Sequence, residues 1–445
     1  MGKYQAEDIV RLAAEEDVEF IRLQFTDIFG VLKNVAITVS QLENALHNRC
    51  IFDGSVIEGF VRIEESDMYL YPDLDTFEIF PWRPQQGKVA RLICDVYRPN
   101  GESFEGDPRQ VLRRVMEEAA QMGYHVMVSP ECEFFLFPTD EEGTPSLDSH
   151  EKAGYFDVSP LDLSENVRRD VILNLEEMEI GVMASHHEKS PFQHEIDLER
   201  QEALDTADHI MTFKMATRTI ARRHGYHATF MPKPRAGVNG SGMHLHILLV
   251  DEHGKNVFED VADPRGLSQE AYYFMGGILS HMKGLSLLTN PLVNSYKRLI
   301  PGYDAPVYLA WSANANRSAM LRIPSGRGMD TSIELRSPDS AMNPYLAIAG
   351  CLAAGLDGIK NRKSCPDPVE KNLFHMTDQE KSKLGVEKLP ETLGEAIAAF
   401  EQDIFVHQVL GDHIYEKYLE AKKREWKEFR ADVTDWEVQE YLYKY

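Results

Sequence analysis

Residues 126–137 read VMVSPECEFFLF, an apolar run that is interrupted by two acids, Glu131 and Glu133. The richness in valine and phenylalanine predicts a buried β-strand. Alternate residues of a strand point the same way, so the two carboxylates share one face, about 7 Å apart. Burying two like charges costs several kcal/mol unless a cation compensates, and a divalent metal ion is the simplest such cation. The alternative is an edge strand with one solvated face.

The chain around this strand is predicted to form two domains. Asp107 is a good helix N-cap and Pro108 suits the first helical position, so a helix is expected from about residue 109 to residue 122. Strands and helices alternate from there onward, which predicts domains 1–104 and 105–445. Three earlier stretches are predicted as strands of a small mixed sheet: residues 20–25, 31–39 and 88–97.

The composition is that of an acidic globular protein. Its 445 residues include 47 basic and 72 acidic side chains, a net charge of −25, which disfavours binding to nucleic acid or to an anionic membrane. The five cysteines form no Cys-x-x-Cys pair, and no apolar run approaches the ~20 residues of a membrane span. The N-terminus lacks the apolar run of a signal peptide. We therefore expect a cytoplasmic protein without a membrane segment.

A second acidic segment is residues 185–197, SHHEKSPFQHEID, where Glu188 and Glu195 lie among three histidines. Carboxylates with neutral histidine are ligands of magnesium or manganese. A polar surface loop is the alternative interpretation.

Residues 237–246, GVNGSGMHLH, predict a close approach of the backbone to a ligand, because glycine leaves room there. The segment is neither a phosphate-binding P-loop nor a dinucleotide fingerprint, and a tight hairpin would explain it equally well. A cluster of cations follows later in the chain, around the acid Glu334: Lys297, Arg298, Arg317, Arg322, Arg327 and Arg336. Arginine forks suit phosphate and carboxylate oxygens, although structural salt bridges are the simpler explanation. Metal-binding acids with arginines would equip a protein for phosphoryl transfer to a carboxylate.

These segments resemble glutamine synthetases of the bacterial type I class, in the shorter subclass without an adenylylation insert. Further matching stretches are residues 52–55, 60–68, 228–234, 294–298, 316–318 and 343–345. The resemblance implies an α+β fold, with an N-terminal β-grasp domain and a large α/β catalytic domain. It implies an ATP-dependent ligase that makes glutamine from glutamate and ammonium through γ-glutamyl phosphate. It also implies a dodecamer of two hexameric rings, with active sites between subunits and the Asp53 loop contributed in trans.

The resemblance also assigns roles to residues. Two or more Mg²⁺ (or Mn²⁺) ions are expected per site, one held by Glu131, His244 and Glu334, the other by Glu133, Glu188 and Glu195. Glutamate is expected to contact Asn239, Gly240, Arg298, Arg317 and Arg336, and the amine to contact Tyr155. ATP is expected to contact His246 and Arg322, and Asp53, Asp304 and Arg317 are expected to be catalytic. Arg62 matches an arginine associated with glutamine feedback.

The chain departs from the family pattern mainly where the amine is expected. Val56 replaces a serine, Asp304 replaces a glutamate that is one methylene longer, and Ser332 replaces an arginine that faces ATP. Lys189, Ser190 and Phe192 replace a small neutral pattern, and the segment 312–317 is one residue longer than usual. These departures keep two alternatives open: a glutamate–amine ligase for a polyamine or aromatic amine, or a catalytically weak regulatory ring. Ammonium stays the leading substrate because Asp53, Tyr155 and a carboxylate at position 304 are present.

Overall fold

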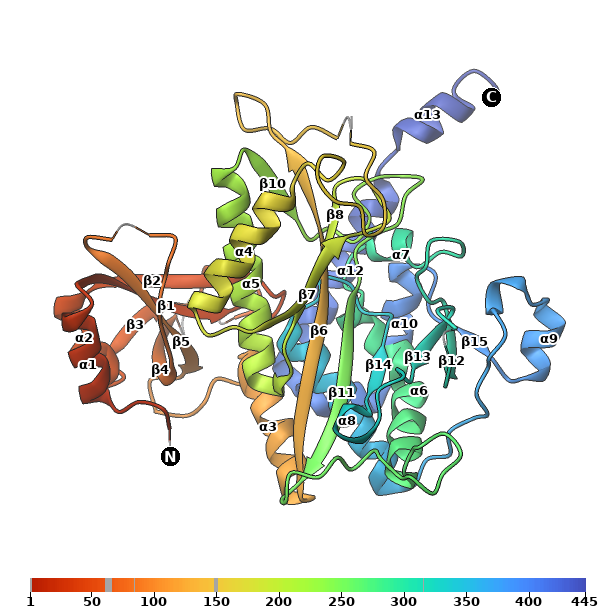
Figure 1. Ribbon diagram of the computed structural model, residues 1–445, viewed down its shortest axis with the longest axis horizontal. Coiled ribbons are helices and arrows are strands. Elements are labelled where there is room, and N and C mark those ends of the chain that lie inside the picture. The colour runs from red at the N-terminus through yellow and green to blue at the C-terminus, as the bar shows by residue number, and fades with distance from the viewer. Residues whose placement is uncertain (1, 61–65, 84, 148–150, 315) are drawn as a thin grey trace.

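The computed structural model describes residues 2–60, 66–83, 85–147, 151–314 and 316–445. Figure 1 shows a small sheet with two short helices beside a much larger sheet that is covered by long helices. The small part is formed by the first hundred residues, and helix α3 (Pro108–Gln121) leads into the large part. The expected α+β architecture is thus confirmed, whereas Arg62 lies outside the described residues.

The small sheet has five strands in the order β2-β1-β5-β4-β3. Its strands are β1 (Val18–Thr26), β2 (Leu32–Thr38), β3 (Cys50–Asp53), β4 (Asp67–Ile79) and β5 (Lys88–Tyr97). Strands β1 and β5 pair in parallel and the other neighbours are antiparallel. Helices α1 (Ala6–Glu15) and α2 (Leu42–Leu46) close its apolar core, which includes Ile21, Leu23 and Leu92. The three predicted strands of this region are confirmed.

The large sheet has ten strands and is built around the long strand β6 (Tyr124–Pro138), which contains the segment that opened the sequence analysis. The order of its main path is β15-β12-β13-β14-β11-β6-β8-β7. These strands are β7 (Val182–His187), β8 (Gln193–Leu198), β11 (Met243–Asp251), β12 (Tyr308–Ser312), β13 (Ala319–Arg322), β14 (Ile333–Leu335) and β15 (Glu387–Lys388). Two short strands, β9 (Gln201–Glu202) and β10 (Tyr226–Thr229), also pair with β6.

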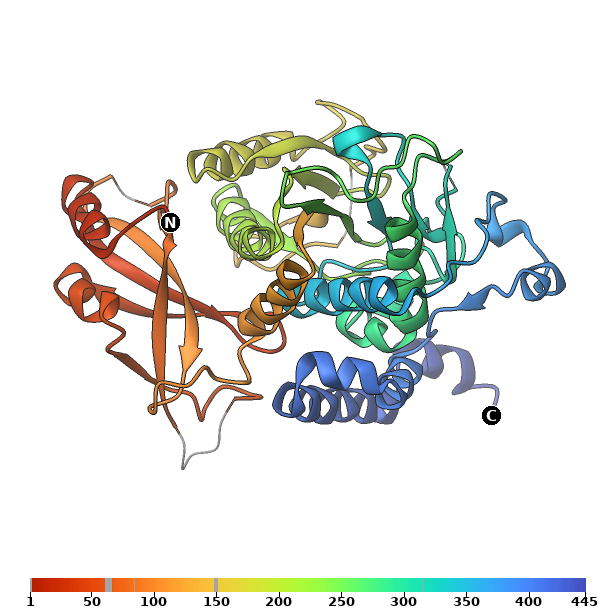
Figure 2. The ribbon, with the colours of Figure 1, turned by 90° about the horizontal axis from the view of Figure 1, so that it is seen from below.

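Long helices pack against this sheet and bury its apolar face, as the view from below shows (Figure 2). The helices that follow α3 are α4 (Glu165–Glu177), α5 (Ala203–Arg223), α6 (Gln269–Thr289), α7 (Ser295–Arg298), α8 (Pro344–Asn361), α9 (Asp378–Lys383), α10 (Leu393–Gln402), α11 (Ile404–Leu410), α12 (Asp412–Ala431) and α13 (Asp435–Tyr441). Helix α13 has no buried residue and projects from the large part (Figure 1). The apolar helix α8 is almost wholly buried, so its lack of a polar face is expected. Among the helices of the described ranges, we find none with the length and apolarity that crossing a bilayer requires.

Helix α3 begins where the sequence predicts. The Asp107 carboxylate accepts a hydrogen bond from the Arg109 backbone N–H at 2.9 Å, and Pro108 occupies the first turn. The Arg109 side chain bonds Asp73 and Asp95 of the small sheet and Asp208 of α5. A buried arginine therefore joins the small sheet to the helices of the large part, because three carboxylates compensate its charge.

Candidate active site

Strand register brings the acidic segments together across the centre of the large sheet. Glu131 of β6 lies opposite His244 of β11, and Glu133 of β6 lies opposite Glu195 of β8. On the next strand outward, His186 of β7 lies opposite Glu195. Cross-strand partners have Cβ atoms about 5 Å apart, so side chains from three separate segments meet on one face.

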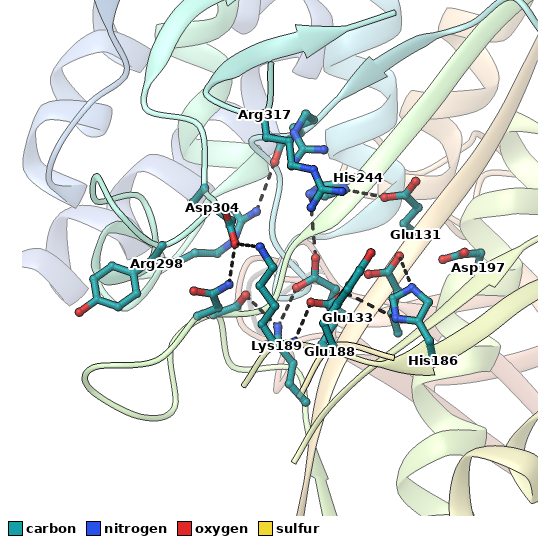
Figure 3. Close-up of a pocket in the computed structure, with 18 of the residues that line it drawn as sticks. Glu131, Glu133, His186, Glu188, Lys189, Asp197, His244, Arg298, Asp304 and Arg317 are labelled. Atoms are coloured by element: carbon teal, nitrogen blue, oxygen red, sulfur yellow. Dashed lines mark hydrogen bonds and ion pairs between the residues drawn. The ribbon is translucent and has the colours of Figure 1, made fainter. Parts of the chain in front are cut away.

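These side chains line a cavity of about 230 Å³, shown in Figure 3. Thirteen of the predicted site residues line it: Glu131, Glu133, Tyr155, Glu188, Glu195, Asn239, Gly240, His244, Arg298, Asp304, Arg317, Arg322 and Arg336. Arg298, Arg317 and Asp304 lie on one side, and Glu131, Asp197 and His186 on the other (Figure 3). The cavity therefore has a carboxylate-rich side and an arginine-rich side.

Two histidines of β11 converge on Glu131. Nδ1 of His244 lies 2.6 Å from one Glu131 oxygen, and Nε2 of His246 lies 2.7 Å from the other. Burial opposes ionisation of Glu131, but the bonds from both imidazoles outweigh it and lower its pKa. His246 thus reaches the same carboxylate as the predicted ligand His244, because alternate residues of a strand share a face.

Glu334 of β14 completes this group. It is fully buried, and it lies 3.7 Å from Nδ1 of His244. Arg322 bonds one of its oxygens, and Nη1 of Arg336 bonds the other at 2.7 Å. The two arginines neutralise a buried acid and fix its orientation toward the histidines.

A second group of acids lies on the β7–β8 hairpin. Ligand atoms of His186, Glu188 and Glu195 all lie within 4.8 Å of one another. At such separations two carboxylates repel by about 3 kcal/mol for an effective dielectric of about 20. Burial and the charge of Glu133 raise the pKa of Glu188 to about 7 and that of Glu195 to about 12. This group would gain most from a bound cation.

On the arginine-rich side of the cavity, backbone carbonyls hold Arg298 in place. Arg298 is buried, and its guanidinium donates to the Ser337 carbonyl at 2.8 Å and the Arg336 carbonyl at 3.2 Å. A Cβ at Gly242 would stand 2.6 Å from its Nη2, so only glycine fits beside it. Arg317, in contrast, is exposed at the cavity rim. Arg298 is therefore fixed by backbone carbonyls, whereas the exposed Arg317 forms a side-chain hydrogen bond with Tyr155.

Asp304 and Lys189 meet across the mouth of the cavity. Nζ of Lys189 lies 2.5 Å from Oδ2 of Asp304, and the Asn239 amide donates to the same oxygen at 3.0 Å. Burial opposes ionisation of Asp304, but these two partners outweigh it and lower its pKa. Tyr155 lies nearby, with its ring 5.9 Å from Nζ of Lys189.

Asp53 is a predicted site residue that lies outside this cavity. It ends strand β3 of the small sheet, is exposed, and is not among the residues that line the cavity. The Ser55 hydroxyl and backbone N–H bond its carboxylate at 2.6 and 2.8 Å, and these bonds lower its pKa. Neighbouring Val56 is 83% exposed.

Five polar residues of the cavity were not predicted as site residues: His186, Lys189, Gln193, Asp197 and Tyr303. Gln193 donates to Glu133 at 2.8 Å and to the Gly240 carbonyl at 3.0 Å. Asp197 lies opposite Glu131, and burial beside that acid raises its pKa to about 7. His186 faces Glu188 and Glu195. Strand alternation from Glu195 points to Asp197 and Gln193, so part of this signal was present in the sequence.

The donor atoms fit hard divalent cations. Within the described residues, two groups of possible ligands include residues that line this cavity: Glu131 with His246 and Glu334, and His186 with Glu188 and Glu195. Carboxylate oxygens dominate both groups and no cysteine takes part, which favours magnesium or manganese over zinc. Burial and the charge of Glu133 raise the pKa values of Glu188 and Glu195, so a cation bound between them would favour their ionised forms.

The fold and this cavity define an enzyme class: a metal-dependent transferase or ligase that handles anionic, phosphorylated substrates. Residues 105–441 match the glutamine synthetase catalytic domain, and residues 17–99 match the glutamine synthetase β-grasp domain. The chain is 58% identical to a glutamine synthetase of Clostridium saccharobutylicum over 445 residues, all of both chains. It is 52% identical to one of Staphylococcus aureus over 443 residues, 99% of each chain. This chain therefore belongs to the glutamine synthetase family.

Solved structures agree with this membership. A GmaS/ADP complex superposes with a TM-score of 0.89 at 31% identity, covering 98% of this chain and 99% of that one. A Plasmodium falciparum glutamine synthetase superposes with a TM-score of 0.87 at 26% identity, covering 99% of each. Family membership implies an ATP-dependent ligase that uses a divalent metal ion and assembles as an oligomer.

Proposed function

We propose that this protein joins ammonium to the γ-carboxylate of glutamate at the expense of ATP, and so makes glutamine. The observation that carries the proposal is that two clusters of acidic residues and four arginines meet at one cavity. Such a cavity suits a reaction in which negative charge spreads over phosphoryl and carboxylate oxygens. The full-length likeness to glutamine synthetases supports the same activity.

In this proposal two or more magnesium or manganese ions occupy each site. Glu131, His244 and Glu334 hold one ion, with His246 next to it toward ATP, and Glu133, Glu188 and Glu195 hold another. When bound, the ions neutralise phosphate charge and orient the transferring group. Gln193 positions Glu133 by a hydrogen bond, and Arg336 positions Glu334.

The arginine side holds the amino acid. Asn239, Gly240 and Arg298 bind glutamate, and Arg336 supports this region. Arg317 and Arg322 face the γ-carboxylate and the phosphoryl group, where their fixed charges stabilise the developing negative charge. The γ-carboxylate oxygen attacks the terminal phosphorus of ATP, which yields γ-glutamyl phosphate and ADP. Ammonia nitrogen then attacks the acyl carbon, and phosphate leaves.

The amine side must remove a proton from ammonium before this attack. We assign this role to Asp304 and to Asp53 of a neighbouring subunit, with Tyr155 lining the site. Supporting this arrangement, Asp53 does not line the cavity of its own chain and carries exposed Val56 beside it. Exposed Phe20 and Ile51 in the same part of the chain suit an intersubunit contact. The assembly proposed is a dodecamer of two hexameric rings.

Two smaller assignments complete the proposal. We place the domain boundary between residues 104 and 105, before the Asp107 cap of α3. We place the enzyme in the cytoplasm, where its ATP is made and where its five free cysteines stay reduced. Arg62 is proposed to mediate feedback by glutamine.

The test is ATP-dependent phosphate release by the purified protein with magnesium and glutamate, with and without ammonium. Release that ammonium stimulates, with glutamine as the product, is expected. If phosphate is not released with ammonium but is released with a polyamine or an aromatic amine, the protein is a glutamate–amine ligase instead. If no amine stimulates phosphate release, the remaining interpretation is a catalytically weak regulatory ring.

A further inference from the structure

Lys189 and Asp304 come from different loops and meet over the cavity. Lys189 follows Glu188 in the β7–β8 connection, and Asp304 precedes strand β12. Their 2.5 Å contact crosses the amine side of the site, and Figure 3 shows the lysine side chain extended toward the aspartate. The Asn239 amide bonds the same Asp304 oxygen at 3.0 Å. The Asn239 amide thus orients the Asp304 carboxylate, and the Lys189 ammonium group forms an ion pair with it.

Lys189 differs in chemistry from the other cations of the cavity. Among the residues that line it, within the described ranges, Lys189 carries the one primary ammonium group. Arg298 is bound to backbone carbonyls, and Arg322 and Arg336 are bound to Glu334. An ε-ammonium is a compact charge with up to three N–H donors, and so resembles an ammonium ion more closely than a guanidinium does.

The surroundings of this ammonium group are those that a small cation requires. A carboxylate contacts it directly, and the Tyr155 ring lies 5.9 Å away, within the range of a cation–π contact. Tyr155 and Asp304 are the two residues of this chain that the proposed function assigns to the amine. The lysine therefore occupies the position that the amine substrate needs.

We propose that the ε-ammonium of Lys189 is a resident competitor for the acceptor amine, which must leave Asp304 before ammonium can bind there. The inference rests on the proposed function, because it takes ammonium as the acceptor and Asp304 as its base. Lys189 is then a specificity-determining residue. It raises the ammonium concentration that the enzyme needs, and it blocks the site while no acceptor is present.

The exposure of the pair favours an exchangeable contact over a structural one. The two side chains are 41% and 45% exposed, and solvent-exposed ion pairs are weak. Release of the lysine therefore shifts the ammonium requirement by about two- to five-fold. Competition of this kind acts on the KM for ammonium, while the KM for glutamate changes little.

The experiment compares Lys189→Met and Lys189→Arg with the wild-type protein. The KM for ammonium is measured at constant ionic strength with saturating ATP, glutamate and magnesium. We expect K189M to lower this KM two- to five-fold, and K189R, which keeps a cation on Asp304, to leave it within two-fold. Lys423→Met is the matched control, because Lys423 pairs with Glu401 at 2.5 Å with similar exposure but outside the cavity.

A double-mutant cycle with Asp304→Asn isolates the pair. Because D304N removes the proposed base, the cycle is followed by ammonium-dependent thermal unfolding and not by turnover. In the D304N background, K189M should not change the ammonium concentration that stabilises the protein, because the competitor has lost its partner. An unchanged KM in K189M, with more phosphate release in the absence of ammonium, would overturn the proposal and make the pair a closing latch.

A second readout needs no turnover. Thermal unfolding is followed while ammonium chloride replaces sodium chloride, and K189M should be stabilised at lower ammonium concentrations than the wild type. If the wild type makes no glutamine but this difference is present, the proposed function is wrong, whereas the competition between Lys189 and ammonium for Asp304 is supported. If the two proteins respond alike, the resident cation is overturned whatever the activity.

Discussion

Glu133 of β6 lies directly opposite Glu195 of β8 in the antiparallel register. Two acids in a cross-strand pair repel each other, and a sheet seldom tolerates such a pair without compensation. Gln193 and the Gly242 backbone N–H satisfy one oxygen of Glu133, whereas burial and Glu133 itself raise the pKa of Glu195 to about 12. Glu195 is therefore protonated at neutral pH unless a cation compensates its charge.

We expect Glu195→Gln to stabilise the metal-free protein at alkaline pH. The native state holds a proton on Glu195 at pH 8 and the unfolded state does not, so the wild-type free energy of unfolding falls as pH rises from 5 to 8. A glutamine cannot titrate, so E195Q should be more stable than the wild type by about 1–3 kcal/mol at pH 8. Thermal unfolding with a chelator at pH 5 and pH 8 measures this.

The same variant should respond less to magnesium. Millimolar magnesium should raise the unfolding temperature of the wild type more than that of E195Q, because a ligand has been removed. Glu252→Gln, an exposed glutamate remote from the cavity, is the control and should behave like the wild type. A wild-type protein more stable than E195Q at pH 8 without metal would contradict the interpretation.

Metal affinity should rise with pH between about 6 and 8. Burial and neighbouring acids raise the pKa of Glu188 to about 7 and that of Glu195 to about 12, and ligands must lose their protons to bind a metal. Each proton released makes the apparent affinity up to about ten-fold tighter per pH unit. Calorimetric titration with Mn²⁺ in buffers of different ionisation enthalpy counts these protons. An affinity independent of pH would refute the assignment of this cluster.

Arg336 should matter more for stability than Arg322. Both bond the buried Glu334, but Arg336 is itself buried, while the Arg322 side chain is 25% exposed. Arg336→Met should lower the free energy of unfolding by about 1–3 kcal/mol, because it leaves a buried carboxylate with one cation fewer. Arg322→Met should cost less, since water can solvate the oxygen that it leaves. Urea unfolding at fixed protein concentration with a chelator compares the two.

Mixed oligomers should reveal whether Asp53 acts in trans. Asp53→Asn and Glu133→Gln should each abolish most of the activity as pure assemblies. If each site takes Asp53 from one subunit and Glu133 from another, random equal mixing should restore about a quarter of the sites. Co-expression followed by a glutamine assay measures this. A mixture of E133Q with Glu188→Gln is the control and should stay inactive, because both residues line the same subunit's cavity; equal activity of the two mixtures would disprove the trans arrangement.

Local patterns were sufficient to predict a few of the elements, among them the central strand of the large sheet. The strand over residues 126–137 lies within β6, and the helix expected from residue 109 begins at Pro108, one position earlier. Both predictions depended on neighbouring residues alone: an apolar run, and an aspartate before a proline. The roles assigned to individual site residues came from the family resemblance and stay predictions.

The sequence by itself determined the fold class, the strand that carries Glu131 and Glu133, and membership of the glutamine synthetase family, because these depend on patterns along the chain. Tertiary structure alone decided which side chains meet. It brought Lys189 into contact with Asp304, 115 residues later in the chain, and it directed both His244 and His246 toward Glu131. It also left Asp53 outside the cavity of its own chain. The physical reason is that strand register and loop packing bring distant residues within bonding distance, and no local pattern specifies a partner so far along the chain.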